Sequence, residues 1–170
     1  KFSRPRQEWK YDDLASSMAD LGKARSFASG KQVFQVANCV ACHRMNGVGY
    51  EIGPDLSKLD AKQTATDILR SLLEPSAKID PKYATQILEL ESGKIVTGLL
   101  VEETADSVKL VENPLAKTEP MDIPKSEIAE RQSSPTSAMP LGLADRLTRE
   151  EILDLIAYLI ARGDAKNEIF

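Results

Sequence analysis

The chain has 170 residues, enough for one well-buried domain or for a small domain with an insertion and a tail, but not for two domains of ordinary size. Hydrophobic residues make up 42% and charged residues 28%, and no apolar run reaches bilayer-spanning length, which excludes a membrane-spanning segment in this sequence. The formal net charge is -4 at pH 7 and the basic residues are dispersed, which argues against nucleic acid as a partner. Because the sequence begins with Lys1 and opens without an apolar signal core, we expect a processed chain or a fragment of a longer one.

Residues 1–25 are predicted to be an N-terminal extension outside the core. They contain the only tryptophan, Trp9, and a weakly amphipathic stretch over residues 14–21 that fits a short helix. The start is loosely basic, which we interpret as a solvated terminus. Its basic residues are Lys1, Arg4, Arg6 and Lys10.

A helix is predicted over about residues 26–42, where it runs straight into a cysteine motif. Its apolar face consists of Phe27, Val33, Phe34, Val36 and Ala37. Gly30 lies inside this helix, where glycine costs about 1 kcal/mol relative to alanine. A close crossing with another helix would explain its presence.

The two cysteines of the chain, Cys39 and Cys42, stand three positions apart, and the only histidine, His43, follows directly. Cys-x-x-Cys-His is the signature of covalent haem attachment. The thiols form thioethers with the haem vinyl groups, and the imidazole binds the iron from one face. The pattern therefore predicts one haem c with His43 as an axial iron ligand.

Three other interpretations of the motif are open. A structural zinc site needs four ligands, and the chain offers only three thiol and imidazole groups. A thioredoxin-like redox pair needs a strand before the motif, where a helix is predicted. A structural disulfide with an incidental histidine fits an oxidising compartment but leaves the rest of the pattern unexplained.

A glycine-rich loop over residues 44–56 follows the motif and ends in Gly53, Pro54, Asp55 and Leu56. Glycines permit the backbone angles that a loop needs to wrap around a flat cofactor. A helix is then predicted over about residues 64–73, with apolar residues at helical spacing, and Pro75 ends it.

The hydrophobic period changes between about residues 82 and 130, where segments rich in β-branched and apolar residues alternate with turn residues. Strands are predicted over residues 83–91, 94–103 and 107–112, continued by residues 119–123 and a short final strand. These segments predict an antiparallel β meander that forms an insertion in a helical domain. The fold class is therefore mainly α with a β insertion, an α+β arrangement.

The last predicted helix starts after a loop over residues 131–142. Thr148 and Glu151 form a capping box at its start, an apolar stripe follows, and Gly163 is predicted to end it. The haem-binding domain is expected to span residues 26–162, interrupted by the β insertion, and residues 163–170 are expected to form a C-terminal tail.

These motifs together resemble those of a class I cytochrome c. More narrowly, the chain resembles the Planctomycete-type haem-binding domain at the C-terminus of multidomain dehydrogenase proteins, which has an insertion before the methionine loop. The narrower resemblance is based on three segments: residues 72–76 (Leu-Leu-Glu-Pro-Ser), residues 98–100 (Gly-Leu-Leu) and residues 137–140 (Ser-Ala-Met-Pro).

This resemblance implies roles for individual residues. Met139 supplies the second axial ligand, Pro54 offers its carbonyl to the ring N–H of His43, and Gly53 and Leu56 belong to the haem-binding segment. Gly30 and Tyr158 match positions where the first and last helices cross closely. For Met139 the alternative is an ordinary apolar loop residue. Of the other methionines, Met18 lies in the N-terminal extension, Met45 is too near His43 to reach the opposite haem face, and Met121 lies in the predicted sheet.

The expected function is single-electron transfer between a dehydrogenase module and an acceptor, by an electron carrier that is not itself an enzyme. The alternative is a haem c enzyme or gas sensor with an open sixth coordination site. A peroxidase would need a distal acid–base residue, and the chain has no second histidine. The expected location is periplasmic or otherwise extracytoplasmic in a bacterium, and the expected partner is a redox protein.

Overall fold

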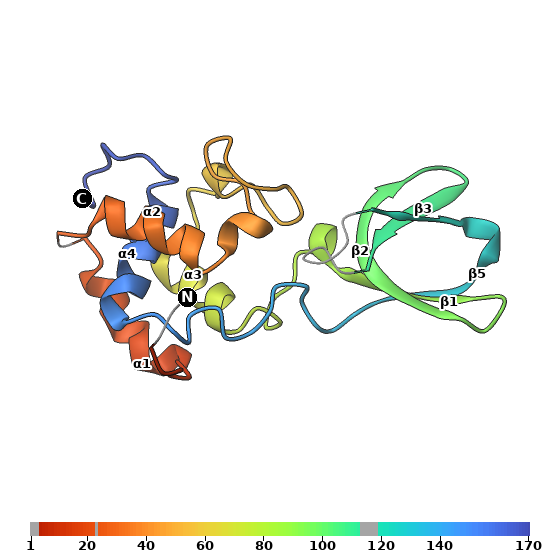
Figure 1. Cartoon of the computed structure of the whole chain (residues 1–170), viewed down its shortest axis with the longest axis horizontal. Helices are drawn as coiled ribbons and strands as arrows, with labels where there is room; N and C mark the ends of the chain where they lie inside the picture. Colours follow the sequence, from red (N-terminus) through yellow and green to blue (C-terminus); the bar gives the residue numbers. More distant parts are fainter. Residues whose placement is uncertain (1–3, 23, 113–118) are drawn as a thin grey trace. The chain divides into compact units, whose positions relative to one another are not determined.

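Two compact units make up the chain in a computed structural model (Figure 1), which describes residues 4–22, 24–112 and 119–170. The first unit combines Lys1–Ala77 with Pro140–Phe170, and the second is Lys78–Met139. Parts of the predicted extension and insertion, residues 1–3, 23 and 113–118, lie outside the described residues. Within the described ranges there are four α-helices and a five-stranded sheet, and none of the helices is long and apolar enough to cross a bilayer.

The first unit is helical. Its α-helices are α1 (Tyr11–Ala15), α2 (Phe27–Val36), α3 (Ala65–Leu73) and α4 (Arg149–Ile160), and its 3-10 turns are η1 (Ser16–Asp20), η2 (Cys39–Ala41) and η3 (Leu56–Lys58). The predicted capping box of Thr148 with Glu151 is present at the start of α4. The helical residues stop at Ile160, and Gly163 closes the end of the helix as predicted. Gly163 has a φ of +70° and donates its N–H to the carbonyl of Tyr158 (3.1 Å), which closes the helix end.

The predicted close helix crossing at Gly30 is present between α2 and α4. A Cβ atom on Gly30 would overlap the carbonyl oxygen of Asp154 and would lie 2.6 Å from the Cβ of Tyr158. The Tyr158 ring in turn contacts Phe27 and Phe34, with ring centroids 5.4 and 5.9 Å apart. Glycine is therefore needed here because the backbones approach too closely for any side chain.

The N-terminal extension takes part in this core, contrary to the prediction. Leu14 is fully buried, and Met18 and Leu21 are 7% and 4% exposed. The predicted short helix over residues 14–21 is replaced by α1 and η1, which together bury one apolar side of the segment. The extension therefore stabilises the helical unit by apolar burial.

The second unit is a five-stranded antiparallel sheet with strands β1 (Thr85–Leu90), β2 (Ile95–Glu103), β3 (Ser107–Val111), β4 (Met121–Pro124) and β5 (Ile128–Ser133). The strand order is β4-β3-β2-β1-β5. The first four strands form the predicted meander, with neighbours in sequence paired in space. β5 departs from it, since after the 3-10 turn η5 (Lys125–Glu127) the chain returns to pair with β1 at the opposite edge.

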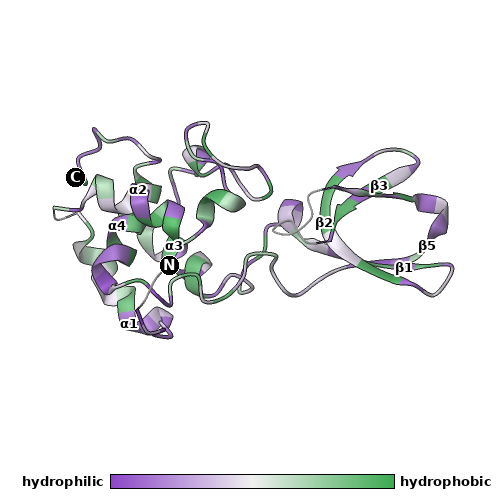
Figure 2. Cartoon of the chain, viewed as in Figure 1, coloured by the Kyte–Doolittle hydropathy of each residue, from purple (hydrophilic) through white to green (hydrophobic). Residues whose placement is uncertain are grey.

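The sheet has its own apolar core, separate from that of the helices. It consists of Leu88, Val96, Val108, Leu110 and Ile123, packed against Leu90, Leu100, Met121 and Ile128. Figure 2 shows apolar segments on β1 and β2. Buried and less buried residues alternate along β1, as expected for a sheet with one face toward a core.

Candidate cofactor site

The segment that leads into the cysteines makes a sharp turn. The predicted continuous helix over residues 26–42 is wrong, because α2 ends at Val36. Ala37 and Asn38 donate their N–H groups to the carbonyls of Val33 and Gln35, and Asn38 then adopts a left-handed conformation with a φ of 63°. Asparagine tolerates this conformation better than most residues. The turn separates the motif from the helix axis and gives it a helical turn of its own.

That separate turn carries both cysteines. Cys42 and His43 both donate their N–H groups to the carbonyl of Cys39, at 3.1 and 2.8 Å. Residues three apart in such a turn lie on one side, so Cys39 and Cys42 lie on the same side of it. Both cysteines are free thiols, Cys39 buried and Cys42 half-buried.

Burial keeps these thiols protonated. Desolvation raises the pKa of Cys39 to about 12 and also raises the pKa of Cys42. Neutral thiols of this kind are poor nucleophiles, which is unlike the low-pKa cysteine of a thioredoxin-like redox pair. The named strands also begin only at Thr85, so among the described residues before the motif there is no strand of the kind that this alternative requires.

His43 is held by its ring nitrogen. Its Nδ1 lies 2.9 Å from the carbonyl oxygen of Pro54. A carbonyl can only accept a hydrogen bond, so Nδ1 carries the proton and the lone pair remains on Nε2. Burial lowers the pKa of His43, partly offset by this hydrogen bond, which favours the neutral imidazole that binds metals. The contact expected between Pro54 and His43 is therefore present.

Gly53 provides a flat surface under this ring. A Cβ atom there would lie 2.7 Å from Cε1 and 3.0 Å from Nδ1 of His43. Any side chain at position 53 would push the ring out of its place. Together with Pro54, Gly53 therefore fixes both the position and the orientation of the imidazole.

The loop over residues 44–56 is bound to the motif by backbone hydrogen bonds. Ile52 and Gly53 both donate to the carbonyl of Cys42, Tyr50 donates to Val40, and Leu56 donates to Arg44. The loop is folded back onto Val40 and Cys42.

Two further residues of this loop, which were not predicted from the sequence, contribute to the site. Gly49 has a φ of +104°, and a Cβ atom on it would overlap the carbonyl oxygen of His43. Asn46 donates from its amide to the carbonyls of Arg162 and Gly163, at 3.3 and 3.1 Å, which ties the loop to the end of α4. Gly49 could have been found as a glycine in a glycine-rich loop, but nothing in the sequence pairs Asn46 with residues more than 100 positions away.

The structure brings most of the predicted site residues together in the first unit: Cys39, Cys42, His43, Gly53, Pro54 and, at the start of η3, Leu56. Met139 is not among them, since it is the last residue of the second unit. It is half-buried and donates its backbone N–H to the hydroxyl of Ser137 (3.1 Å).

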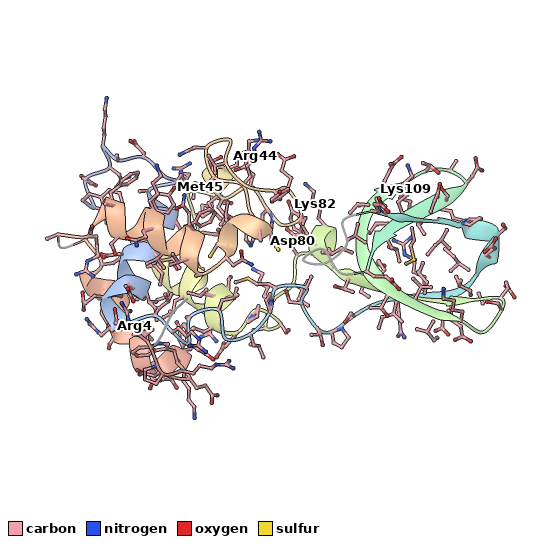
Figure 3. All side chains as sticks on the ribbon, viewed as in Figure 1. Arg4, Arg44, Met45, Asp80, Lys82 and Lys109 are labelled. Carbon is pink, nitrogen blue, oxygen red and sulfur yellow. The ribbon has the colours of Figure 1, made fainter. Side chains whose placement is uncertain are left out.

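Met45 is engaged elsewhere in the first unit. Met45, labelled in Figure 3, is only 2% exposed, and its backbone bonds to Val48 in both directions. Its sulfur lies against Gly163, where a Cβ atom would be 3.1 Å away. Met45 therefore serves the packing between the loop and the end of α4.

The chemistry of these groups fits a covalently held haem better than it fits zinc. Two free thiols on one turn can form two thioethers, and the imidazole held through Nδ1 keeps Nε2 for iron. A zinc site needs four ligands, and within the described ranges no group of three or more His, Cys, Asp or Glu side chains is placed to hold a metal ion.

Comparison with known families agrees with this chemistry. Residues 27–110 match the family model for Cytochrome c. The match extends from α2 through the motif, the glycine loop and α3 into the sheet, and it implies covalently bound haem c with iron. Proteins of this family are generally electron carriers. No curated protein matches the chain.

Proposed function

We propose that this chain is a c-type cytochrome that transfers single electrons, with its haem joined to Cys39 and Cys42 and its iron ligated by His43 and Met139. One observation carries the proposal. Two free thiols on one turn precede an imidazole whose Nδ1 is bound to the Pro54 carbonyl, so that Nε2 remains for iron. When bound, the haem supplies an iron that cycles between the ferric and ferrous states.

The residues of this chain set the properties of that iron. The Pro54 carbonyl orients the imidazole of His43 and increases its basicity. A thioether from Met139 would be a softer and weaker donor than an imidazole, and it would raise the reduction potential. If His43 and Met139 both ligate the iron, no coordination position would remain for a substrate, which favours electron transfer over the enzyme and gas-sensor alternative.

The partner and the location follow from the resemblance described above. We propose that electrons pass between a dehydrogenase module and a protein acceptor in the periplasm or another extracytoplasmic space. Cytochrome c domains of bacteria are usually extracytoplasmic. The half-buried Val40 and Ala41 lie between the two cysteines, and their short side chains would allow a partner to approach the thioether edge of the haem.

Spectroscopy of the Met139→Ala variant tests the ligation. The oxidised wild-type protein should show the weak red absorption band of methionine-ligated ferric haem, and the variant should lose that band and have a lower reduction potential. Met121→Ala is a matched control, since Met121 is also partly buried in the second unit. Retention of the band in Met139→Ala would assign the sixth ligand elsewhere.

Two further measurements test the wider proposal. Haem colour that leaves the protein on extraction with acidified acetone would contradict covalent attachment. Rapid, tight carbon monoxide binding by the reduced wild-type protein, with peroxide turnover well above that of free haem, would favour the enzyme alternative.

A further inference from the structure

The segment over residues 4–9 is hydrogen-bonded at several points to residues 145–151, at the start of α4 and in the loop before it. Gln7 donates its N–H to the carbonyl of Asp145 (2.7 Å), and the indole Nε1 of Trp9 donates to the carbonyl of Leu147 (3.1 Å). Arg6 donates from Nε and Nη2 to one carboxylate oxygen of Asp145, at 3.1 and 2.5 Å. We call residues 4–9 the strap.

The start of the strap is bound to the first turn of α4. Arg4, labelled in Figure 3, donates to the carboxylate of Glu151 at 2.5 Å, and its own carbonyl accepts from Arg146 at 3.0 Å. Glu151 is the residue that completes the capping box with Thr148. The strap therefore holds both the loop before α4 and the helix start itself.

Arg6 of the strap packs against a turn that starts at Gly142. Gly142 has a φ of +79°, and its carbonyl accepts the N–H of Asp145 (3.1 Å). A Cβ atom on Gly142 would lie 2.9 Å from Nη2 of Arg6 and 2.8 Å from the Asp145 carboxylate. The guanidinium is packed directly on this turn, so removal of Arg6 takes away both an ion pair and a packing surface.

This turn begins three residues after Met139 along the chain. A chain of three residues spans at most about 11 Å, so the position of the turn limits how far Met139 can move. We propose that the strap is a positioning element that favours the conformation in which Met139 ligates iron. This inference rests on the proposed function, because it gives the strap a role only if Met139 is the sixth ligand.

Binding of imidazole to the ferric protein measures this role. Added imidazole competes with the methionine, so its apparent affinity increases in proportion to the fraction of molecules in which Met139 has left the iron. The Arg6–Asp145 pair is partly exposed, with Arg6 side-chain exposure of 65% and Asp145 exposure of 14%. Loss of such a pair should raise the apparent imidazole affinity about two- to fivefold.

The variants separate positioning from general stability. Arg6→Ala and Trp9→Phe should both increase the imidazole affinity, and Arg6→Lys should restore part of the wild-type value. The control is Glu74→Gln, which removes an exposed ion pair with Arg70 (2.7 Å) on α3. Glu74→Gln should leave the imidazole affinity unchanged, even if it lowers the denaturant midpoint of unfolding by as much as Arg6→Ala does.

The outcomes distinguish failure of the strap's positioning role from failure of the proposed ligation by Met139. If the wild-type protein shows the methionine band but Arg6→Ala and Trp9→Phe bind imidazole like Glu74→Gln, the strap does not position Met139 and the inference is overturned. If wild-type protein lacks the band and binds imidazole as tightly as Met139→Ala, the proposed ligation itself fails and the inference fails with it.

Discussion

At the scale of single residues, the position of the His43 imidazole depends on the lack of a side chain at Gly53. Gly53 contacts the His43 ring so closely that a methyl group would lie 2.7 Å from Cε1. Either the ring or the loop must then shift, at the expense of the hydrogen bond between His43 and Pro54. Overpacking of this kind costs about 1–3 kcal/mol.

We therefore expect Gly53→Ala to lower the denaturant midpoint of the haem-loaded protein and to shift its ferric spectrum, because the axial imidazole is displaced. Gly22→Ala is the matched control, since a Cβ atom on Gly22 meets nothing within 4 Å. That control should be neutral or stabilising by about 0.4–1 kcal/mol. A Gly53→Ala spectrum identical to wild type would show that the ring tolerates the methyl group.

At the scale of secondary-structure elements, the contact between α2 and α4 opposes helix propensity. Alanine is favoured over glycine by about 1 kcal/mol inside a helix. At position 30, however, the new methyl group would overlap the Asp154 carbonyl and crowd Tyr158. The clash involves a backbone atom of a buried helix, so it cannot be relieved by rotation of a side chain.

Gly30→Ala should therefore destabilise the protein by about 1–3 kcal/mol despite the gain in propensity. Gln32→Ala, at an exposed position of the same helix, provides the control and should change stability by less than about 0.5 kcal/mol. Thermal unfolding followed by far-ultraviolet circular dichroism measures both. Equal stability of Gly30→Ala and wild type would mean that the helices move apart at little cost.

A second element-scale effect concerns Glu103, at the end of β2, which binds Lys125 and Arg131 at 2.9 and 3.1 Å. Hydrogen bonds from Lys125, then from Arg131, hold the pKa of Glu103 below its usual value. A carboxylate with a lowered folded pKa contributes stability above its unfolded pKa, and this contribution is lost as the pH falls through the folded pKa. The two ion pairs of Glu103 therefore stabilise the sheet at neutral pH and not in strong acid.

Glu103→Gln should accordingly lower the urea midpoint of the sheet near pH 7 and have no effect near about pH 2. The exposed Glu91 supplies the control, because Glu91→Gln leaves the contacts of Glu103 in place. An equal loss for Glu103→Gln at both pH values would indicate that packing of the side chain, rather than its charge, is responsible.

At the scale of the whole molecule, the haem chemistry and the sheet belong to different units with different cores. The thiols, His43 and Pro54 all lie in the helical unit, and the sheet completes its own hydrogen bonds and apolar cluster. Replacement of residues 82–130 by a short flexible linker that keeps Met139 should thus preserve the haem spectrum. The full-length protein is the reference. Loss of haem attachment with retained helicity would show that the sheet is required at the site.

The sequence alone determined the features that depend on local chemistry. The Cys-x-x-Cys-His motif predicted the attachment site, because it contains both cysteines and the single histidine. Capping at Thr148, the antiparallel strands and the close crossing at Gly30 were also predicted, since each has a short-range pattern of residue types. For the capping box and the meander, the interacting residues are also near one another in the chain.

Only the tertiary structure decided the rest. The pairing of β5 with β1 and the burial of Leu14 depend on contacts between distant segments. The fastening of residues 4–9 to Asp145 and Leu147 joins positions more than 130 residues apart. Apolar burial and hydrogen bonding can stabilise any two segments that meet in the folded chain. The periodicity of one segment does not tell which other segment it will meet.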